Sequence, residues 1–111
     1  MKLWIDDMRV APEGYIHIKS VDEAKECIVF AEEQYANRNN VFYDCSNFII
    51  EVIDIDHDAG DYAIFGGDYI KLLDWLEETG RSYPIRIHSM NPVGIENMRR
   101  IIQRNDWIEV R

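Results

Sequence analysis

The chain has 111 residues and a net charge of −9, with 47% hydrophobic and 12% aromatic residues. This composition supports one hydrophobic core and excludes a disordered chain, and no apolar run approaches the roughly 20 residues of a membrane-spanning helix. Residues 1–80 hold 18 acidic and 6 basic side chains, which argues against non-specific binding of long duplex nucleic acid. We expect a single cytoplasmic domain over residues 1–111, without membrane contact, whose partner is a small phosphorylated ligand or a metal ion.

The first part of the chain predicts two strands and a helix. Lys2–Asp6 is typical of a short buried strand that ends in acid, and Tyr15–Lys19 alternates as a second strand. Only a short loop joins them, although a parallel crossover usually needs a dozen residues or more. Either these strands form a hairpin or the first crossover helix has shrunk to a loop. Ser20, with Glu23 three residues later, is a capping box that opens a helix.

The second part predicts three more strands and two helices. Phe48–Asp56 is β-branched and mostly apolar, as expected of a central strand. Asp68 is placed to cap the second helix, and Gly80 is its stop signal. The remaining elements are a strand at Ile85–His88, a helix opened by Pro92 and a strand at Trp107–Val110. This strand–helix alternation predicts an α/β fold, with a parallel sheet covered by helices on both faces.

Polar and titratable side chains follow three of the predicted strands. They are Asp6-Asp7 after the first strand, Asp56-His57-Asp58 after the central strand, and His88-Ser89-Met90-Asn91-Pro92 after the fourth. In open parallel sheets, ligands bind beyond the carboxyl ends of the strands. We therefore expect the chemistry of the protein at this edge of the sheet.

The residue types at this edge suit phosphate chemistry. Several carboxylates without a compensating lysine either raise a pKa or recruit a cation, and Mg²⁺ prefers such oxygen ligands. Two histidines could act as acid and base near neutral pH. Each histidine alone is more simply a core residue, and Arg9 alone is as readily a surface charge as a phosphate ligand, so it is the convergence of these groups that favours a site. Asp54, on the otherwise apolar central strand, is either edge-exposed or paired.

At these positions the sequence resembles a receiver domain of two-component signalling. Asp6-Asp7 match the acidic pair of a receiver, Asp56 matches the phosphoacceptor that ends the third strand, and Ser89 matches the hydroxyl residue that ends the fourth. The chain departs from that pattern because no Lys-Pro follows its last strand and its first crossover helix is missing.

The sequence is more closely similar to a divergent branch of receivers, the cyclic-phosphate processing receiver-like family. The matching motifs are Leu3-Trp4-Ile5-Asp6-Asp7 with Arg9 and Pro12 shortly after, Asp56-His57-Asp58, and His88-Ser89-Met90-Asn91-Pro92-Val93-Gly94. The resemblance spans nearly the whole chain and implies a first crossover helix shrunk to a loop. It also implies a role in handling cyclic phosphate ends in RNA-repair settings.

The preferred interpretation is a receiver-like (flavodoxin-like), doubly wound domain with a mainly parallel five-stranded sheet and a reduced first crossover. Its expected activity is metal-assisted hydrolysis of a cyclic or terminal nucleotide or RNA phosphate. Asp6, Asp7 and Asp56 would hold Mg²⁺ or Mn²⁺. One of His57 and His88 would activate water and the other would protonate the leaving ribose oxygen, with Asp56 completing the catalytic set. Arg9, Ser89 and Asn91 would hold the phosphate.

The sequence also leaves two alternative functions that are not enzymatic. One is an atypical receiver, phosphorylated at Asp56 or binding a partner as a pseudo-receiver, and the other is a nucleotide-binding module without turnover. The two histidines favour the enzyme, because a phosphoacceptor site does not need them. The missing lysine counts against ordinary phosphorelay.

Overall fold

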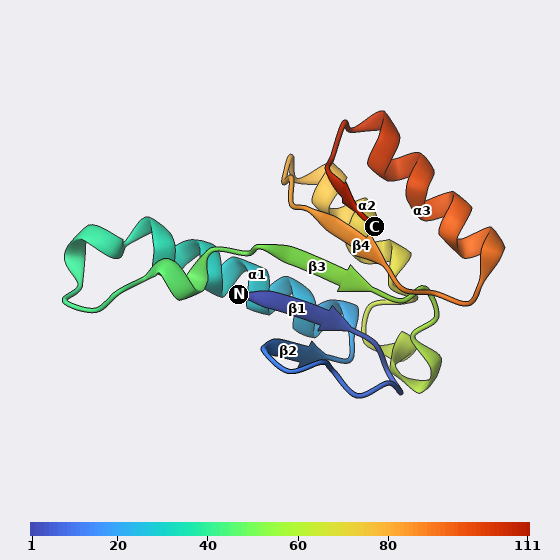
Figure 1. Cartoon of the computed structure of the whole chain (residues 1–111), viewed down its shortest axis with the longest axis horizontal. Coiled ribbons are helices and arrows are strands. Elements are labelled where there is room, and N and C mark those ends of the chain that lie inside the picture. Colours follow the sequence, from blue (N-terminus) through green and yellow to red (C-terminus); the bar gives the residue numbers. More distant parts are fainter.

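The computed structural model describes residues 1–111 and contains one five-stranded sheet in which every strand pair is parallel (Figure 1). The strands are β1 (Lys2–Ile5), β2 (Tyr15–Ile18), β3 (Val52–Ile55), β4 (Ile85–Ile87) and β5 (Glu109–Val110), in the order β2-β1-β3-β4-β5. The helices are α1 (Val21–Ala36), α2 (Ile70–Glu78) and α3 (Pro92–Arg104), with short 3₁₀ turns η1 (Arg38–Asn40), η2 (Ser46–Phe48) and η3 (Gly60–Ile64). The receiver-like α/β fold expected from the sequence is confirmed. None of the helices combines the length and apolar character needed to cross a membrane.

The connection between the first two strands is a loop and not a hairpin turn. Strand β1 pairs in parallel with β2, with Lys2 opposite Tyr15 and Ile5 opposite Ile18. The connecting residues 6–14 contain no helix. The indole Nε1 of Trp4 donates a hydrogen bond of 3.1 Å to the Arg9 carbonyl, which holds this loop against the sheet. The shrunken crossover is therefore correct, and the hairpin is excluded.

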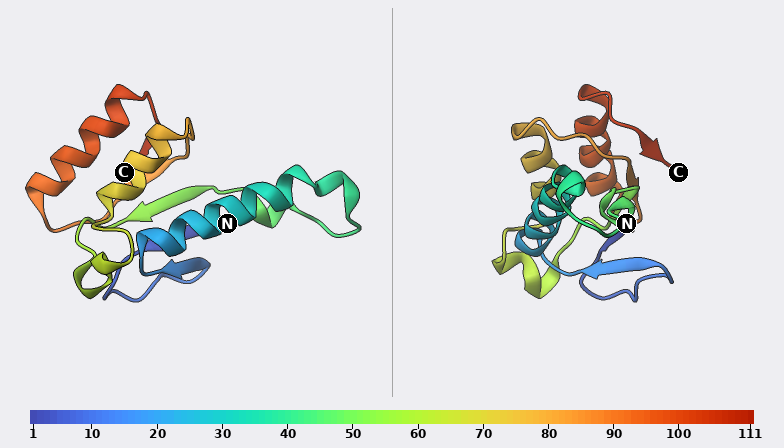
Figure 2. Two further views of the ribbon diagram at one scale, coloured as in Figure 1. Left: turned by 180° about the vertical axis from the view of Figure 1, so that it is seen from behind. Right: turned by 90° about the vertical axis from the view of Figure 1, so that its left-hand side faces the viewer.

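The three helices lie on the same side of the sheet (Figure 2). Leu3 and Ile5 of β1 point to the helices and are fully buried, whereas Trp4 between them points to the other face and is only half-buried. The expectation of helices on both faces is therefore wrong. Right-handed connections that run in opposite directions along a sheet cover opposite faces, and only the connection from β1 to β2 runs toward the β2 edge. The one connection on the second face, residues 6–14, has lost its helix.

One of the two expected helix caps is present, and a third helix has a cap that had not been expected from the sequence. The Ser20 hydroxyl accepts a hydrogen bond of 3.1 Å from the Glu23 N–H at the start of α1. Asn91 caps α3, because its side-chain oxygen accepts a bond of 3.0 Å from the Gly94 N–H. The expectation for Asp68 is wrong, since its carboxylate accepts the Ala59 N–H at 3.0 Å and leaves α2 without a side-chain cap.

The central strand is shorter than the sequence predicts. Only Val52–Ile55 of the predicted Phe48–Asp56 belongs to β3. The Phe48 N–H donates to the Cys45 carbonyl at 3.0 Å, which closes the 3₁₀ turn η2 instead of joining a strand. The last strand is likewise reduced to Glu109–Val110. Apolar, β-branched residues are compatible with either structure, so their pattern did not mark the boundary.

The end of α1 and the residues after it project from the body of the molecule as an arm, which we define as residues 34–50 (Figure 1). The molecule measures 46 Å along its longest axis and 29 Å and 25 Å along the others. The arm leaves the body at the amino-terminal side of the strands, away from the edge where the candidate residues gather.

An ion pair joins α1 to the segment before β4, and it predicts a pH-dependent contribution to stability. The Arg81 Nε donates to both carboxylate oxygens of Glu32 at 3.0 Å, and the Tyr83 hydroxyl also donates to Glu32. Burial alone would raise the pKa of Glu32, but the bonds from Arg81 and Tyr83 outweigh it and lower the pKa below its ordinary 4.5. The ionised form is therefore favoured by folding, so the contribution is present above about pH 4.5 and is lost as the pH falls through the lower folded pKa.

We expect Glu32→Gln to reduce the free energy of unfolding by about 1 kcal/mol at pH 7, because Glu32 is partly solvated and the pair is screened. The difference in the free energy of unfolding between this variant and the parent protein should shrink as the pH falls below about 4.5. Urea unfolding at several pH values measures both. Glu33→Gln, at an exposed position of α1 without an ion pair, is the matched control. A difference that persists unchanged at low pH would contradict the assignment.

Candidate functional site

Three carboxylates meet at the carboxyl edge of the sheet, and we call this group the acidic centre. Asp6 and Asp7 follow β1, and Asp56 follows the neighbouring β3. One oxygen of each lies within 4.8 Å of one oxygen of each of the others. Asp6 is fully buried, whereas Asp7 and Asp56 are half-buried and accessible. The structure therefore brings together the three residues that the sequence proposed as metal ligands.

The loop after β1 keeps Asp6 ionised despite its burial. Its Oδ1 accepts hydrogen bonds of 2.8 Å from the backbone N–H groups of Met8 and Arg9. Burial alone would raise the pKa of Asp6, but these two N–H groups and the ring of His88 outweigh it and hold the pKa below its ordinary value. The carboxylate is thus negatively charged at neutral pH.

The negative charges of the acidic centre are not balanced by a lysine or arginine. None of the three carboxylates forms an ion pair with either residue type, and Asp6 pairs only with His88. The pKa of the nearby Tyr69 hydroxyl is raised. Burial is the main cause, and the negative charges of Asp7, Asp6 and Asp56 add to it. Carboxylates this close together repel one another, which raises a pKa or is relieved by a cation.

His88 is held between two buried carboxylates. Its Nδ1 lies 2.5 Å from Oδ1 of Asp54, and its Nε2 lies 2.9 Å from Oδ2 of Asp6. The ring also stacks on Trp4, with centroids 3.8 Å apart and planes 4° from parallel. Asp54 is 1% exposed. Of the two alternatives for Asp54, the structure has the paired one.

These contacts give His88 a different position from the one expected for an acid or base. Both ring nitrogens face carboxylates of the protein, so neither faces the open edge. A ring that bonds Asp6 on one side and Asp54 on the other fixes the orientation of the Asp6 carboxylate. The geometry therefore fits a positioning residue that acts through Asp6.

His57 presents its other nitrogen freely. The Nδ1 lies 2.7 Å from Oδ1 of Asp58 and 3.4 Å from Nδ2 of Asn91, and the shorter contact assigns the proton to Nδ1. Nε2 has no partner within the chain, so in the neutral ring it is the nitrogen that can accept a proton. The backbone N–H of His57 donates a hydrogen bond of 2.8 Å to Oδ1 of Asp56, which ties the histidine to the acidic centre.

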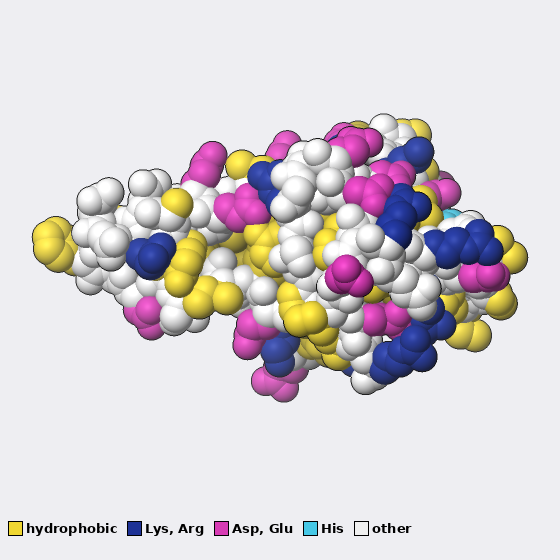
Figure 3. All heavy atoms as spheres, turned by 90° about the horizontal axis from the view of Figure 1, so that it is seen from above, with side chains coloured by type: hydrophobic (Ala, Val, Ile, Leu, Met, Phe, Trp, Pro, Cys, Tyr) yellow, Lys and Arg dark blue, Asp and Glu magenta, His cyan; other side chains and the backbone are white.

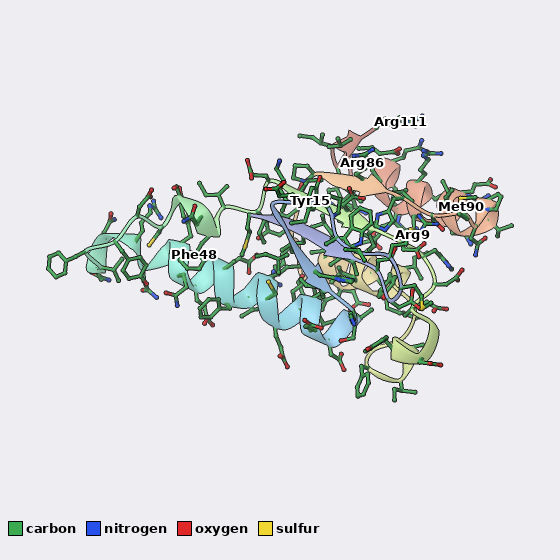
Figure 4. All side chains as sticks on the ribbon, turned by 60° about the horizontal axis from the view of Figure 1, so that its bottom comes forward. Arg9, Tyr15, Phe48, Arg86, Met90 and Arg111 are labelled. Atoms are coloured by element: carbon green, nitrogen blue, oxygen red, sulfur yellow. The ribbon has the colours of Figure 1, made fainter.

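The residues proposed to hold a phosphate lie on the loops around this edge. The Arg9 guanidinium donates to the His88 carbonyl at 3.3 Å, which links the loop after β1 to the loop after β4, where Met90 lies (Figure 4). The Ser89 oxygen accepts the Asn91 N–H at 3.1 Å, so its own hydroxyl proton is free to donate. Asn91 uses its oxygen to cap α3 and keeps its amide nitrogen toward His57.

Two glycines make room for the site, and sequence reasoning missed both. A Cβ at Gly94, in the first turn of α3, would lie 2.5 Å from Cγ of His57, so only glycine lets the helix approach this ring. Gly60 has φ +56° and leaves no room for a Cβ because the Asp7 carboxylate lies against it. Gly94 belongs to a motif that the resemblance already marked, whereas nothing in the sequence signalled Gly60.

The acidic centre is open to solvent and is not enclosed in a cavity. The three cavities of the molecule all border α1 and its arm, and none is lined by a residue of the centre. Exposed apolar side chains lie on the loops beside it, with Met8 83% and Met90 82% exposed. A space-filling view shows a histidine, arginine or lysine side chains and hydrophobic groups together at this end of the molecule (Figure 3).

We compared the chain with known protein families. Residues 1–104 match the family described as the cyclic-phosphate processing receiver domain. The chain belongs to this family. The match covers all three helices and four of the five strands of this receiver domain, and with them the entire acidic centre. No curated protein and no solved structure matches the chain.

Proposed function

We propose that this receiver domain is a metal-assisted phosphoesterase that acts on cyclic or terminal phosphates of nucleotides or RNA ends. One observation carries the proposal. The three carboxylates of the acidic centre lie within 4.8 Å of one another, and the residue next to Asp56 carries an imidazole whose Nδ1 contacts Asp58 and whose Nε2 has no partner in the chain. A cyclic phosphate needs both charge neutralisation and proton transfer to be opened, and a site that offers both supports hydrolysis over simple binding.

The donor set fits a hard divalent cation. All three candidate ligands, Asp6, Asp7 and Asp56, offer oxygen, and Mg²⁺ or Mn²⁺ prefers such ligands. Asp6 is oriented by His88 and by two backbone N–H groups, as is usual for residues that ligate metals. When bound, the cation would supply neutralisation of the negative phosphoryl oxygens.

His57 is proposed to carry the proton. Asp58 holds its Nδ1–H, so that Nε2 accepts a proton from the water that attacks phosphorus. The imidazolium formed in this way can then give a proton to the departing ribose oxygen. In this scheme one histidine serves both steps that the sequence divided between His57 and His88, and His88 instead keeps Asp6 in place.

The phosphate-binding role falls to side chains with free donors. Ser89 and Asn91 lie at the start of α3 and offer a hydroxyl proton and an amide N–H, respectively. The N-terminus of a helix adds a partial positive charge that favours anions. Arg9, which reaches across to the β4 loop, supplies the full positive charge that the centre itself lacks.

We expect purified protein with Mg²⁺ or Mn²⁺ to hydrolyse 2′,3′-cyclic mononucleotides, and a chelator to abolish the activity. Asp56→Asn should raise the cation concentration needed for half-maximal rate, because it removes one negative ligand, and excess cation should restore part of the rate. Rates measured over a cation titration test this.

The control is Asp44→Asn, in the arm, which should leave the titration unchanged. A loss in Asp56→Asn that no cation concentration relieves would contradict a metal-ligand role. A protein that binds cyclic or linear phosphates but turns none of them over would be a sensor, and the phosphoesterase proposal would be wrong.

A further inference from the structure

The arm has a chemistry unlike that of the rest of the molecule. Residues 34–50 contain one positive and one negative side chain, Arg38 and Asp44, in a chain whose net charge is −9. Figure 3 shows hydrophobic side chains at the far end of the arm and a largely uncharged surface along it. Two copies of this acidic protein could therefore approach through their arms without the repulsion that their bodies would generate.

The apolar side chains of the arm are exposed without a partner. Phe42 is fully exposed, Tyr43 is 55% exposed and Ile49 is 46% exposed. Phe42 and Tyr43 lie in the loop between η1 and η2, which forms the tip of the arm. A solvent-exposed cluster of aromatic and aliphatic residues at the end of a projection is characteristic of an interaction surface.

A groove at the base of the same arm complements this tip. It has a volume of about 210 Å³ and is lined by Glu32, Tyr35, Phe48, Ile49, Ile50 and Tyr83. A second hollow of about 360 Å³ shares Tyr35 and Ile49 with it, so the two are contiguous along the arm. An apolar cavity of roughly 150 Å³ already accepts a benzene ring, so the groove can take the side chain of Phe42.

Tip and groove of one chain cannot meet each other, but those of two chains can. When two arms lie antiparallel about a two-fold axis, the tip of each reaches the groove of the other, because the tip-to-groove spacing is the same in both copies.

We propose that this chain forms a two-fold symmetric dimer through its arms, with Phe42 of each copy in the groove of the other. The exposed parts of Tyr35, Phe42, Tyr43 and Ile49 in two copies amount to roughly 1,000 Å², given about 150–250 Å² for a whole aromatic side chain. A specific interface needs about this area. The acidic centres lie at the opposite end of each body and stay accessible, so the dimer does not depend on the proposed activity.

Sedimentation equilibrium of the full chain, from low micromolar to millimolar concentration, tests the proposal. The parent protein should be a dimer. Phe42→Asp and Ile49→Asp should each raise the dissociation constant by about 30-fold or more, as for a hot-spot residue. Val10→Asp, which charges an equally exposed apolar position in the loop after β1, should not.

Mixing the two variants tests the tip-in-groove geometry itself. A mixed dimer of Phe42→Asp and Ile49→Asp chains has one intact contact, between the unmodified tip of one chain and the unmodified groove of the other. The mixture should therefore dimerise more tightly than either variant alone. A parent protein that is monomeric at every concentration overturns the proposal. So does a dimer that is indifferent to both variants, or a mixture no tighter than its components.

Discussion

Replacing His57 with glutamine is expected to reduce the rate of cyclic-phosphate hydrolysis by about 10²–10⁴-fold, the usual contribution of a general acid–base group. Glutamine can keep hydrogen bonds to Asp58 and Asn91, but it cannot accept a proton from water. Substrate binding and cation affinity should therefore change little, and the loss should fall on kcat. Steady-state rates on a 2′,3′-cyclic mononucleotide, at saturating Mg²⁺ or Mn²⁺, measure the effect.

The matched control is His17→Gln on β2. The His17 ring bonds only a backbone oxygen, that of Asp6 at 2.7 Å, and a glutamine amide can replace this bond. This variant should stay close to the parent rate. If His57→Gln kept full activity, the proton would have to be carried by another group, and the role assigned to the free Nε2 would be wrong.

Truncating Asp54 to alanine is expected to lower the free energy of unfolding by about 1–3 kcal/mol, the cost of leaving a buried hydrogen-bond partner unsatisfied. The substitution leaves the Nδ1 of His88 without its hydrogen-bond partner. The site is buried, because Asp54 in the parent protein is only 1% exposed. Asp54→Asn should cost clearly less, because the amide oxygen can still accept a bond from that Nδ1–H. Urea unfolding of both variants measures the difference.

The comparison of the two Asp54 variants separates the effect of the negative charge from the effect of the hydrogen bond. Asparagine and aspartate have nearly the same shape, so equal losses in Asp54→Asn and Asp54→Ala would mean that the negative charge, and not the hydrogen bond, holds His88. A negligible loss in Asp54→Ala would show that the contact between His88 and Asp54 contributes nothing to stability.

The strand ends were predictable because parallel strands share one edge. Asp6, Asp7 and Asp56 each follow an apolar run, and knowing only that these runs are parallel neighbours places their carboxylates together. The order of the strands was harder to predict. The loop between Asp6 and Tyr15 is short enough that the first two strands could also have formed a hairpin. The family resemblance, and then the register of β1 with β2, decided that question.

The contacts of His88 could not be predicted from the sequence. Its partner Asp54 is 34 positions away in the chain and lies on a strand that reads as wholly apolar apart from that residue. The two meet because they share the sheet face that carries no helix, and the absence of that helix follows from the loop before Tyr15. Likewise, the run Phe48–Ile50 has strand-like composition but packs as a turn at the base of the arm, where Phe48 and Ile49 close 3₁₀ hydrogen bonds.

The parallel register also has a consequence for how the chain folds. Strand β1 can meet β2 after a short loop closes, since Lys2 pairs with Tyr15, but it meets β3 only when Lys2 finds Val52. The contact between His88 and Asp6 spans 82 positions. Contacts that close long loops form late and slow the folding of a domain. We therefore expect the acidic centre to be assembled among the last steps of folding, so that in a nascent or partly folded chain the three aspartates are present but far apart.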